Sequence, residues 1–243
     1  KRKLHVVMVK GKSLTTVSSE TTDSAQANKY VEATVDRFNS MGDLKVLYMD
    51  AKTQNMVVYL EKLFFIDFDG GYMFKYDDTQ RNLCVCLQWV IFVSHSCINK
   101  RDRGEQLSVY DNKIATYFNK QGYKPTLYEF QMLTSNVFKS NVLKVYLAFL
   151  IQYYFDERHK VAMVTFNSVE FTFPSREVYI QLMNPTEEEE QDILWGSFPE
   201  NLRTVLVESM KSQPFWAHCA QQCTMCVVEN MRTILDEDTG LGT

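Results

Sequence analysis

Short apolar runs separated by polar residues mark the early part of the chain, and they are typical of strands. Leu4–Val9 predicts one short strand. Leu44–Met49 and Met56–Leu60 are apolar runs on either side of the polar segment Lys52–Asn55, and this pattern predicts a β-hairpin. A further apolar run, Leu63–Phe68, ends at an Asp-Gly-Gly sequence that favours a turn.

Apolar residues at helical spacing form a second pattern, which dominates from about residue 83 onward. Val31, Val35 and Phe38 follow Ser24 on one helix face, so we expect a helix that is capped by Ser24 and ends at Gly42. A second helix is predicted to end at Gly122. Its apolar face is formed by Leu107, Tyr110, Ile114, Tyr117 and Phe118.

Helix start signals are frequent in the second half of the chain. A Ser or Thr followed three residues later by Glu is a capping box, and it occurs at Thr126–Glu129, Thr186–Glu189 and Ser197–Glu200. The first box opens a helical region that we expect to reach about Arg158. Pro214 opens a final helix to about Leu235.

A second hairpin is predicted between these helical regions. The apolar runs Val161–Phe166 and Val169–Phe173 are separated by the two residues Asn167 and Ser168. Two polar residues of this kind between two β-type runs favour a tight antiparallel turn.

The segment Lys12–Asp23 is rich in Ser and Thr and has no periodic apolar face, so we expect an extended arm there. Residues 1–22 are therefore predicted to form an N-terminal strand and arm, and residues 23–243 a helix-rich globular body. The predicted fold class is mainly α: a single helix-rich domain with one or two small β-hairpins and an extended N-terminal arm.

Composition narrows the class of protein. The chain has 26 Lys and Arg against 30 Asp and Glu, a net charge of −4, which argues against specific nucleic-acid binding. The apolar runs at 83–93 and 142–155 are shorter than the roughly 20 residues of a membrane span. No secretory signal pattern is present, so we expect an intracellular protein that spans no membrane.

One apolar run ends in a sequence with catalytic character. Leu63–Gly70 ends in Asp67-Phe68-Asp69-Gly70 and resembles the first motif of haloacid dehalogenase-type phosphatases. This resemblance implies Asp67 as nucleophile, Asp69 as acid/base, Mg²⁺ as cofactor and Thr165 as phosphate holder. Gly71 stands where the family has Thr, and few strands are predicted, so we favour ordinary turn chemistry and expect no catalytic residue and no cofactor.

The sequence also pairs a base with a thiol in His95-Ser96-Cys97. No distant Asn or Asp can be assigned to orient the imidazole as a cysteine-nucleophile site requires. We therefore interpret His95 as a core histidine.

The cysteines suggest two further chemistries. The C-x₃-C-x₂-C spacing near the C-terminus resembles the cluster loop of radical S-adenosylmethionine enzymes, and His218 adds a zinc ligand type. The same spacing places three thiols on one helix face, which favours small buried hydrophobes and no metal. A third interpretation is intermolecular disulfides, formed by some of Cys84, Cys86, Cys97, Cys219, Cys223 and Cys226.

Aromatic residues point toward association. The chain has 13 Tyr and 16 Phe but only 9 Gly and 5 Pro, and residues of this type suit extensive protein–protein contacts. In length, mild acidity, aromatic content, the early Lys1-Arg2-Lys3 cluster and the Glu187–Glu190 run, the chain is similar to polyhedrins, the occlusion-body matrix proteins of insect viruses.

The resemblance implies a self-assembling structural protein whose dense intracellular lattice encases and protects virions, without catalysis. The chain itself and the virion surface are then the expected partners, and the nucleus of the infected host cell is the expected location. The alternative is a Mg²⁺-dependent phosphatase of the haloacid dehalogenase type that uses Asp67 and Asp69.

Overall fold

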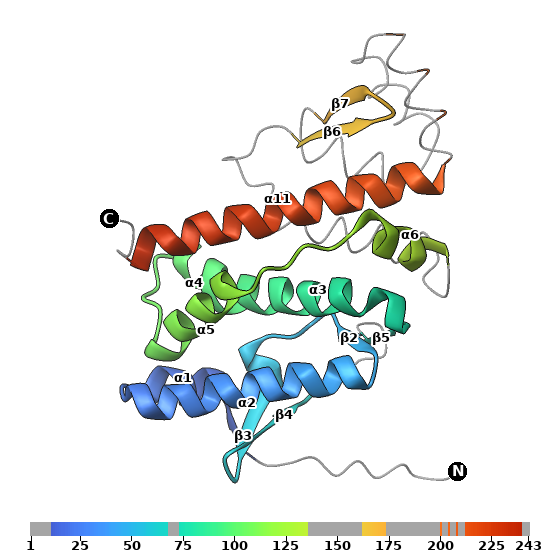
Figure 1. The fold of residues 1–243 in the computed structure, drawn as a ribbon. Helices are drawn as coiled ribbons and strands as arrows, with labels where there is room; N and C mark the ends of the chain where they lie inside the picture. Colours follow the sequence, from blue (N-terminus) through green and yellow to red (C-terminus); the bar gives the residue numbers. More distant parts are fainter. Residues whose placement is uncertain are drawn as a thin grey trace, which may run out of the picture. The chain divides into compact units, whose positions relative to one another are not determined.

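The computed structural model describes residues 11–67, 73–135, 162–173, 200, 204, 208 and 212–239. The chain divides into two compact units, which are treated separately below (Figure 1). Unit 1 consists of Lys1–Tyr123 and Asn230–Thr243, and unit 2 consists of Lys124–Glu229. The long helix α11 (Gln213–Thr239) contributes residues to both units.

Helices make up most of the described part of unit 1, so the mainly α fold class is confirmed. In chain order they are α1 (Leu14–Glu20), α2 (Ser24–Asp43), α3 (Arg81–Val93), α4 (Asn99–Asp102) and α5 (Val109–Lys120). Short 3₁₀ turns precede β3 and α3 at Thr53–Asn55 and Asp78–Gln80. A π-helical turn, Ser94–Ile98, joins α3 to α4.

The predicted helix after residue 24 is confirmed, with a different cap. Asp23, rather than Ser24, caps α2, because its carboxylate accepts hydrogen bonds from the backbone N–H groups of Ala25 and Gln26. Phe38 is buried in the core, and Val31 and Val35 are half-buried, as the apolar face requires.

Two small antiparallel sheets complete the described part of unit 1. One has the strand order β1-β3-β4, formed by Lys12–Ser13, Met56–Tyr59 and Lys62–Phe65. The other pairs β2 (Val46–Tyr48) with β5 (Met73–Lys75).

The hairpin predicted between residues 44–49 and 56–60 is wrong, because β2 pairs with β5 and β3 pairs with β4. The connecting residues form the 3₁₀ turn Thr53–Asn55 instead of a tight turn. The Asn55 amide also donates to the Asp50 carboxylate (2.6 Å), which fixes this connection in a non-hairpin path.

The expected extended arm is also different from Lys12 onward, where the chain forms β1 and α1. Leu14 and Val17 are buried three residues apart, and Ser13 caps the helix by accepting from the Thr16 N–H (3.2 Å). The hydroxyls of Ser18, Ser19 and Thr21 donate to backbone carbonyls within this segment. Because these polar groups are satisfied locally, a sequence rich in Ser and Thr forms a short helix with a buried face.

An aromatic cluster lies in the core of unit 1 where α2, α3 and β4 meet. The ring of Phe38 contacts Trp89 edge-to-face at 4.7 Å and Phe92 at 5.2 Å between centroids, and it stacks on Phe65 at 5.9 Å. Beside it, Tyr110 on α5 and Thr34 on α2 share a buried hydrogen bond of 2.9 Å between their hydroxyls.

Unit 2 contains α6 (Leu127–Ser135), the hairpin β6 (Ala162–Phe166) and β7 (Val169–Phe173), and the first part of α11. The predicted capping box of α6 is confirmed, because Thr126 and Glu129 exchange side-chain and backbone hydrogen bonds. The second predicted hairpin is also confirmed, and its turn residues Asn167 and Ser168 have φ values of 49° and 64°. The boxes at 186–189 and 197–200 and the helix expected up to Arg158 lie outside the described residues.

Candidate functional site

The turn between β3 and β4 has an unusual sequence for its backbone. Tyr59 pairs with Lys62, which leaves Leu60 and Glu61 as a two-residue turn with φ values of 48° and 61°. Turns of this left-handed type are normally built from Asn-Gly, because other residues pay roughly 1–2 kcal/mol each for this conformation. Leu60 therefore adopts a backbone conformation that leucine disfavours.

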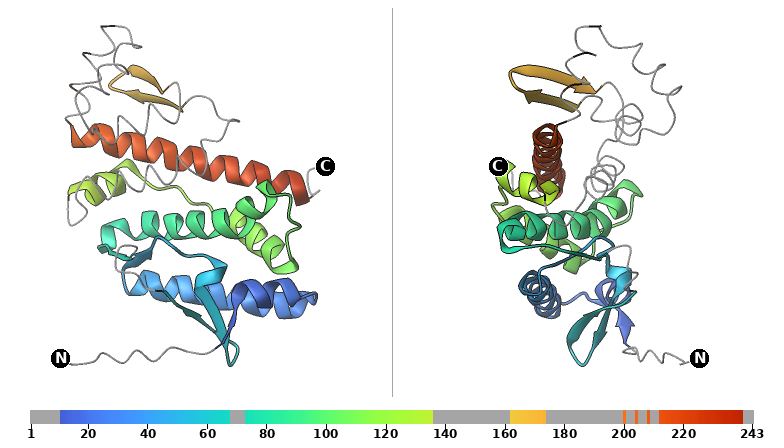
Figure 2. Two further views of the ribbon diagram at one scale, coloured as in Figure 1. Left: turned by 180° about the vertical axis from the view of Figure 1, so that it is seen from behind. Right: turned by 90° about the vertical axis from the view of Figure 1, so that its right-hand side faces the viewer.

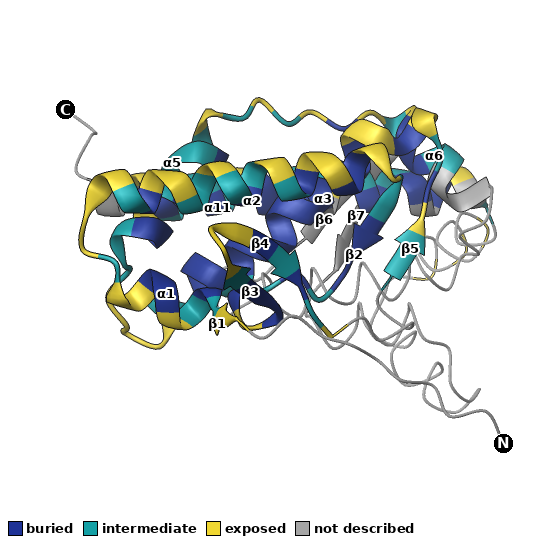
Figure 3. Cartoon of the chain, turned by 90° about the horizontal axis from the view of Figure 1, so that it is seen from below, coloured by how far each residue is buried: buried dark blue, intermediate teal, exposed yellow. Residues whose placement is uncertain are grey.

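The tip of this hairpin projects beyond α2 (Figures 1 and 2), and we refer to Tyr59, Leu60, Glu61 and Lys62 as the hairpin tip. All four residues are exposed (Figure 3), and Leu60 is 76% exposed. Among the described residues, the other exposed large apolar side chains are Leu44 and Tyr128. The tip thus presents an apolar residue flanked by one acidic and one basic side chain.

The base of the hairpin is tightly packed. Met56, Leu63 and Phe65 are buried, and the Arg37 guanidinium lies 5.6 Å from the ring centroid of Phe64. Strand β1 also approaches closely, because a Cβ atom on Gly11 would lie 2.3 Å from the Val58 carbonyl oxygen. Only glycine fits at this position, and the tip is held by a packed three-stranded base.

The residues of the phosphatase alternative are not brought together within one described site. Asp67 is exposed just after β4 with a φ of 62°, and its backbone carbonyl accepts from the Tyr48 hydroxyl (3.0 Å). Thr165 lies in hairpin β6–β7 of unit 2, and Asp69 lies outside the described residues. All described strand pairs are antiparallel, whereas this enzyme class uses a parallel sheet.

The predicted His95-Ser96-Cys97 element forms part of the π-helical turn. His95 is half-buried, and burial lowers the pKa of its imidazole. Cys97 is fully buried with its Sγ atom 3.5 Å from the Asp111 carbonyl oxygen, and burial raises the pKa of this thiol well above its usual value. A thiol that stays protonated is a poor nucleophile, so this geometry favours a structural role for Cys97.

A buried ion pair fixes the start of α5 beside the π-helical turn. The Lys100 ammonium lies 2.7 Å from the Asp111 Oδ2 atom, and the two side chains are 14% and 0% exposed. The same oxygen accepts hydrogen bonds from the backbone N–H (2.9 Å) and hydroxyl (2.8 Å) of Ser108. The arrangement caps α5 and pairs the buried Asp111 carboxylate through its Oδ2 atom, while Oδ1 has no hydrogen-bond partner, and this indicates a structural network.

Burial separates the cysteines into two groups. Cys84, Cys86, Cys97 and Cys219 are buried and cannot meet another folded chain, whereas Cys226 is exposed. The side chain of Cys223 lies outside the description. No disulfide joins the described cysteines, and within the described ranges no group of three His, Cys, Asp or Glu residues could hold a metal ion.

Cys219 and Cys226 lie on one face of the continuous helix α11, because residues seven apart differ in direction by only about 20°, but the expected burial of this face is wrong for Cys226. The buried stripe of α11 runs instead through Ala220, Thr224, Val228 and Met231. Cys226 points away from this stripe with the exposed Gln222 and Glu229, so of the two α11 cysteines with described side chains, Cys219 alone is a buried hydrophobe.

One helical segment of unit 1 has the length and apolar composition of a membrane span. It covers Asp78–Asp102, with α3 at its centre, and 78% of its most apolar window is buried inside the protein. A core helix of a soluble protein has the same properties, so this segment does not decide between the two environments.

The chain matches no protein-family model, no curated protein and no solved structure. The assignment of function therefore depends on the geometry of the chain itself. The hairpin tip was not predicted, although the pairing of Met56–Tyr59 with Lys62–Phe65 across two residues is the sequence signal that marks it.

Proposed function

We propose that the chain is a self-associating structural protein and that the hairpin tip is one of its contact sites with other copies. The observation that carries the proposal is Leu60, which is exposed and held in a left-handed conformation that leucine disfavours. Both features lower the stability of an isolated chain, and burial of Leu60 against another copy would offset the exposure.

The charges of the hairpin tip favour a second copy as its partner. Glu61 and Lys62 are adjacent and exposed, so the tip carries no net charge. A two-fold contact between two tips would bring the acidic residue of one copy to the basic residue of the other. A tip with like charges would instead repel its own copy.

The particular form of the assembly follows from the resemblance to polyhedrins. We propose an occlusion-body matrix that encases virions, with other copies of the chain and the virion surface as partners and the host-cell nucleus as its location. The aromatic residues support this proposal only in part. Tyr48, Tyr76 and Tyr110 are buried with their hydroxyls bonded inside unit 1, so they are not available for contacts.

A double substitution at the tip, Leu60→Asn with Glu61→Gly, tests this function. It introduces the residues that the turn prefers, so the free energy of unfolding should rise by about 1 kcal/mol or more. Association should weaken at least tenfold, because the loss of one buried leucine side chain costs about 1.5–3 kcal/mol. The two readouts are thermal unfolding and sedimentation velocity.

Leu44→Asn is the matched control, since Leu44 is equally exposed (73%) but lies at the end of α2 in a right-handed conformation. It should leave association unchanged. If the tip variant associates as strongly as the native chain, the hairpin tip is not a contact site.

The phosphatase alternative makes a different prediction. We expect no hydrolysis of an aryl phosphate with Mg²⁺, and therefore no change in Asp67→Asn. Activity in the native chain that disappears in this variant would replace the structural proposal with an enzymatic one.

A further inference from the structure

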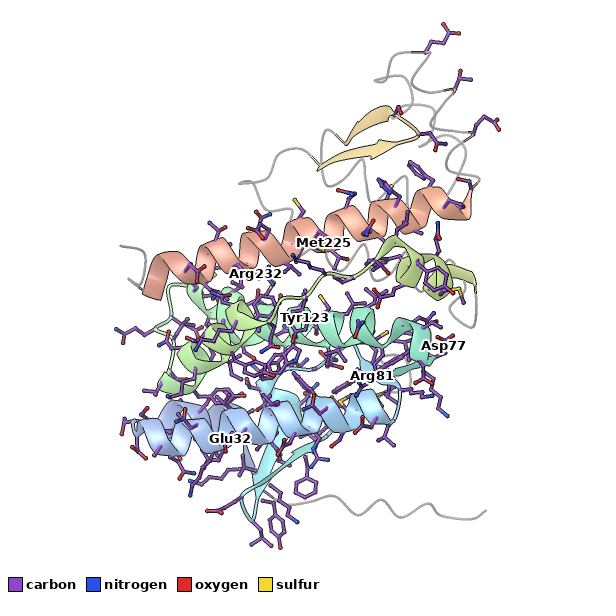
Figure 4. All side chains as sticks on the ribbon, in the orientation of Figure 1. Glu32, Asp77, Arg81, Tyr123, Met225 and Arg232 are labelled. Atoms are coloured by element: carbon purple, nitrogen blue, oxygen red, sulfur yellow. The ribbon has the colours of Figure 1, made fainter. Side chains whose placement is uncertain are left out.

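One arginine of unit 1 lacks the kind of partner that the other described arginines have. The Arg37 guanidinium on α2 forms no hydrogen bond and no ion pair with a described residue, and its Nε atom is buried without a partner. An unpaired guanidinium in a half-buried position is unfavourable for an isolated chain, so Arg37 points to a ligand outside the chain. The other described arginines each donate to a carboxylate or a backbone carbonyl: Arg81 and Arg232, both labelled in Figure 4, and Arg101 and Arg103.

The ring of Phe64 fixes the orientation of this guanidinium. The Arg37 Cζ atom lies 5.6 Å from the Phe64 ring centroid, within the range of a cation–π contact. The buried, unpaired atoms of Arg37 do not include its two terminal nitrogens, which have no described partner either, so these nitrogens are accessible to a ligand. Their parallel N–H groups match the two oxygens of a carboxylate, and a side chain that is already held in place loses less entropy when it binds one.

Arg37 and Phe64 lie on the side of the β1-β3-β4 sheet that faces away from the aromatic cluster. Successive strand residues point to opposite faces, and Phe65 packs in the cluster, so Phe64 points outward. Lys62 is two residues from Phe64 and shares its face, and Tyr59 is the cross-strand neighbour of Lys62. We call this set the Arg37 patch: Arg37, Tyr59, Lys62 and Phe64.

The Arg37 patch carries two positive charges beside two aromatic rings. Tyr59 is 45% exposed and Lys62 is exposed, and the Lys62 ammonium has no described hydrogen-bond or ion-pair partner. Asp36 precedes Arg37 and Glu61 precedes Lys62, but neither of these exposed carboxylates pairs with the two cations. The described part of the chain therefore leaves a local positive charge on this face.

We propose that the Arg37 patch binds an extended acidic segment of a partner protein, which goes beyond the proposed self-association. Residues two apart on a strand lie about 6.7 Å apart, so this distance separates Lys62 from the residue that holds Arg37. Alternate side chains of an extended peptide have the same spacing, so two carboxylates separated by one residue match the two cations. A single phosphate group would instead favour cations that converge on one point.

Fluorescence anisotropy of a labelled peptide tests this docking. The probe is a hexapeptide of alternating Glu and Ser, and the same peptide with Gln in place of Glu is its control. We expect the chain to bind the Glu peptide at low ionic strength and the Gln peptide roughly tenfold more weakly or less. Because the chain has a net charge of −4, general attraction cannot produce this preference.

Arg37→Gln should weaken binding of the Glu peptide roughly tenfold or more. Its midpoint of urea unfolding should stay close to that of the native chain, since Arg37 has no hydrogen-bond partner to lose among the described residues. Arg81→Gln is the matched control, because it removes one positive charge of unit 1 from an exposed ion pair with Asp43. Arg81→Gln should leave peptide binding unchanged.

The tip variant, Leu60→Asn with Glu61→Gly, separates the two proposals. It keeps the Arg37 patch and removes a neighbouring negative charge, so it should bind the Glu peptide at least as tightly as the native chain while it associates less. If the native chain does not bind the Glu peptide at millimolar concentration, or if Arg37→Gln and Arg81→Gln lose binding equally, the docking site is wrong and self-association stands.

Two further outcomes would assign a different occupant and overturn the acidic partner. Inorganic phosphate that displaces the labelled peptide more readily than unlabelled Glu peptide does would assign the patch to phosphate. Self-association that disappears in Arg37→Gln, in a chain that does not bind the Glu peptide, would assign the patch to a second copy.

Discussion

Removal of the Lys100 ammonium should strongly destabilise unit 1. In Lys100→Met, the Asp111 carboxylate loses its counter-ion while it remains 0% exposed. Breaking a buried pair in this way costs about 3–5 kcal/mol. Two donors from Ser108 still reach the same carboxylate oxygen, so we expect the lower end, about 3 kcal/mol.

Arg103→Met is the matched control. The Arg103 guanidinium lies 2.6 Å from the Glu105 carboxylate, but the two side chains are 57% and 49% exposed. Exposed pairs contribute about 0–1 kcal/mol, because solvent screens them and two flexible side chains must be ordered. Both substitutions remove one cation close to α4, so burial is the main difference between them.

Urea unfolding measures the two free energies. Trp89 is buried in unit 1, and its fluorescence can be isolated by replacing Trp195 and Trp216 with Phe. A loss of about 3 kcal/mol corresponds to a midpoint lower by roughly 1–3 M urea for typical slopes. Adding Asp111→Asn to Lys100→Met should restore part of the loss, since the unpaired charge is then gone. Equal, small losses in Lys100→Met and Arg103→Met would refute this reasoning.

Two further predictions concern the strand base and alkaline pH. Gly11→Ala places a Cβ atom against the Val58 carbonyl, so we expect the protection of β1–β3 amides in hydrogen exchange to fall while that of α5 is unchanged. Burial raises the pKa of Tyr76 from 10 to about 12, so its contribution to stability is complete below pH 10 and is lost as the pH rises towards 12. Tyr76 alone should lower the free energy of unfolding by up to about 1.4 kcal/mol per pH unit in that window. Tyr76→Phe should reduce the slope by that amount without abolishing it, because burial also raises the pKa of Tyr48, Tyr110, Tyr117 and Tyr123. Equal slopes in the two proteins would contradict this prediction.

Local signals predicted the elements that depend on local contacts. The apolar face of α2, the capping box of α6 and the turn of hairpin β6–β7 all follow from residues within a few positions of one another. Helix α1 was not predicted because its Ser and Thr residues make the segment polar in composition. Their hydroxyl groups bond to the backbone of the same segment, which the composition does not reveal.

Contacts between distant residues could not be predicted in this way. The Asn119 and Asp236 side chains meet across 117 positions of sequence, and the pairing of β2 with β5 passes over an intervening hairpin. The turn at Leu60 and Glu61 contains neither the glycine nor the asparagine by which such turns are usually predicted. The same unusual sequence is what makes the tip a candidate contact site.

Sedimentation velocity of the native chain across a wide concentration range tests the central claim most directly. The proposed self-association predicts that the average mass rises steadily above the 28.4 kDa of one chain as the concentration increases, at neutral pH and with reductant present. A single species of 28.4 kDa at every concentration, up to the highest that remains in solution, would contradict the structural role.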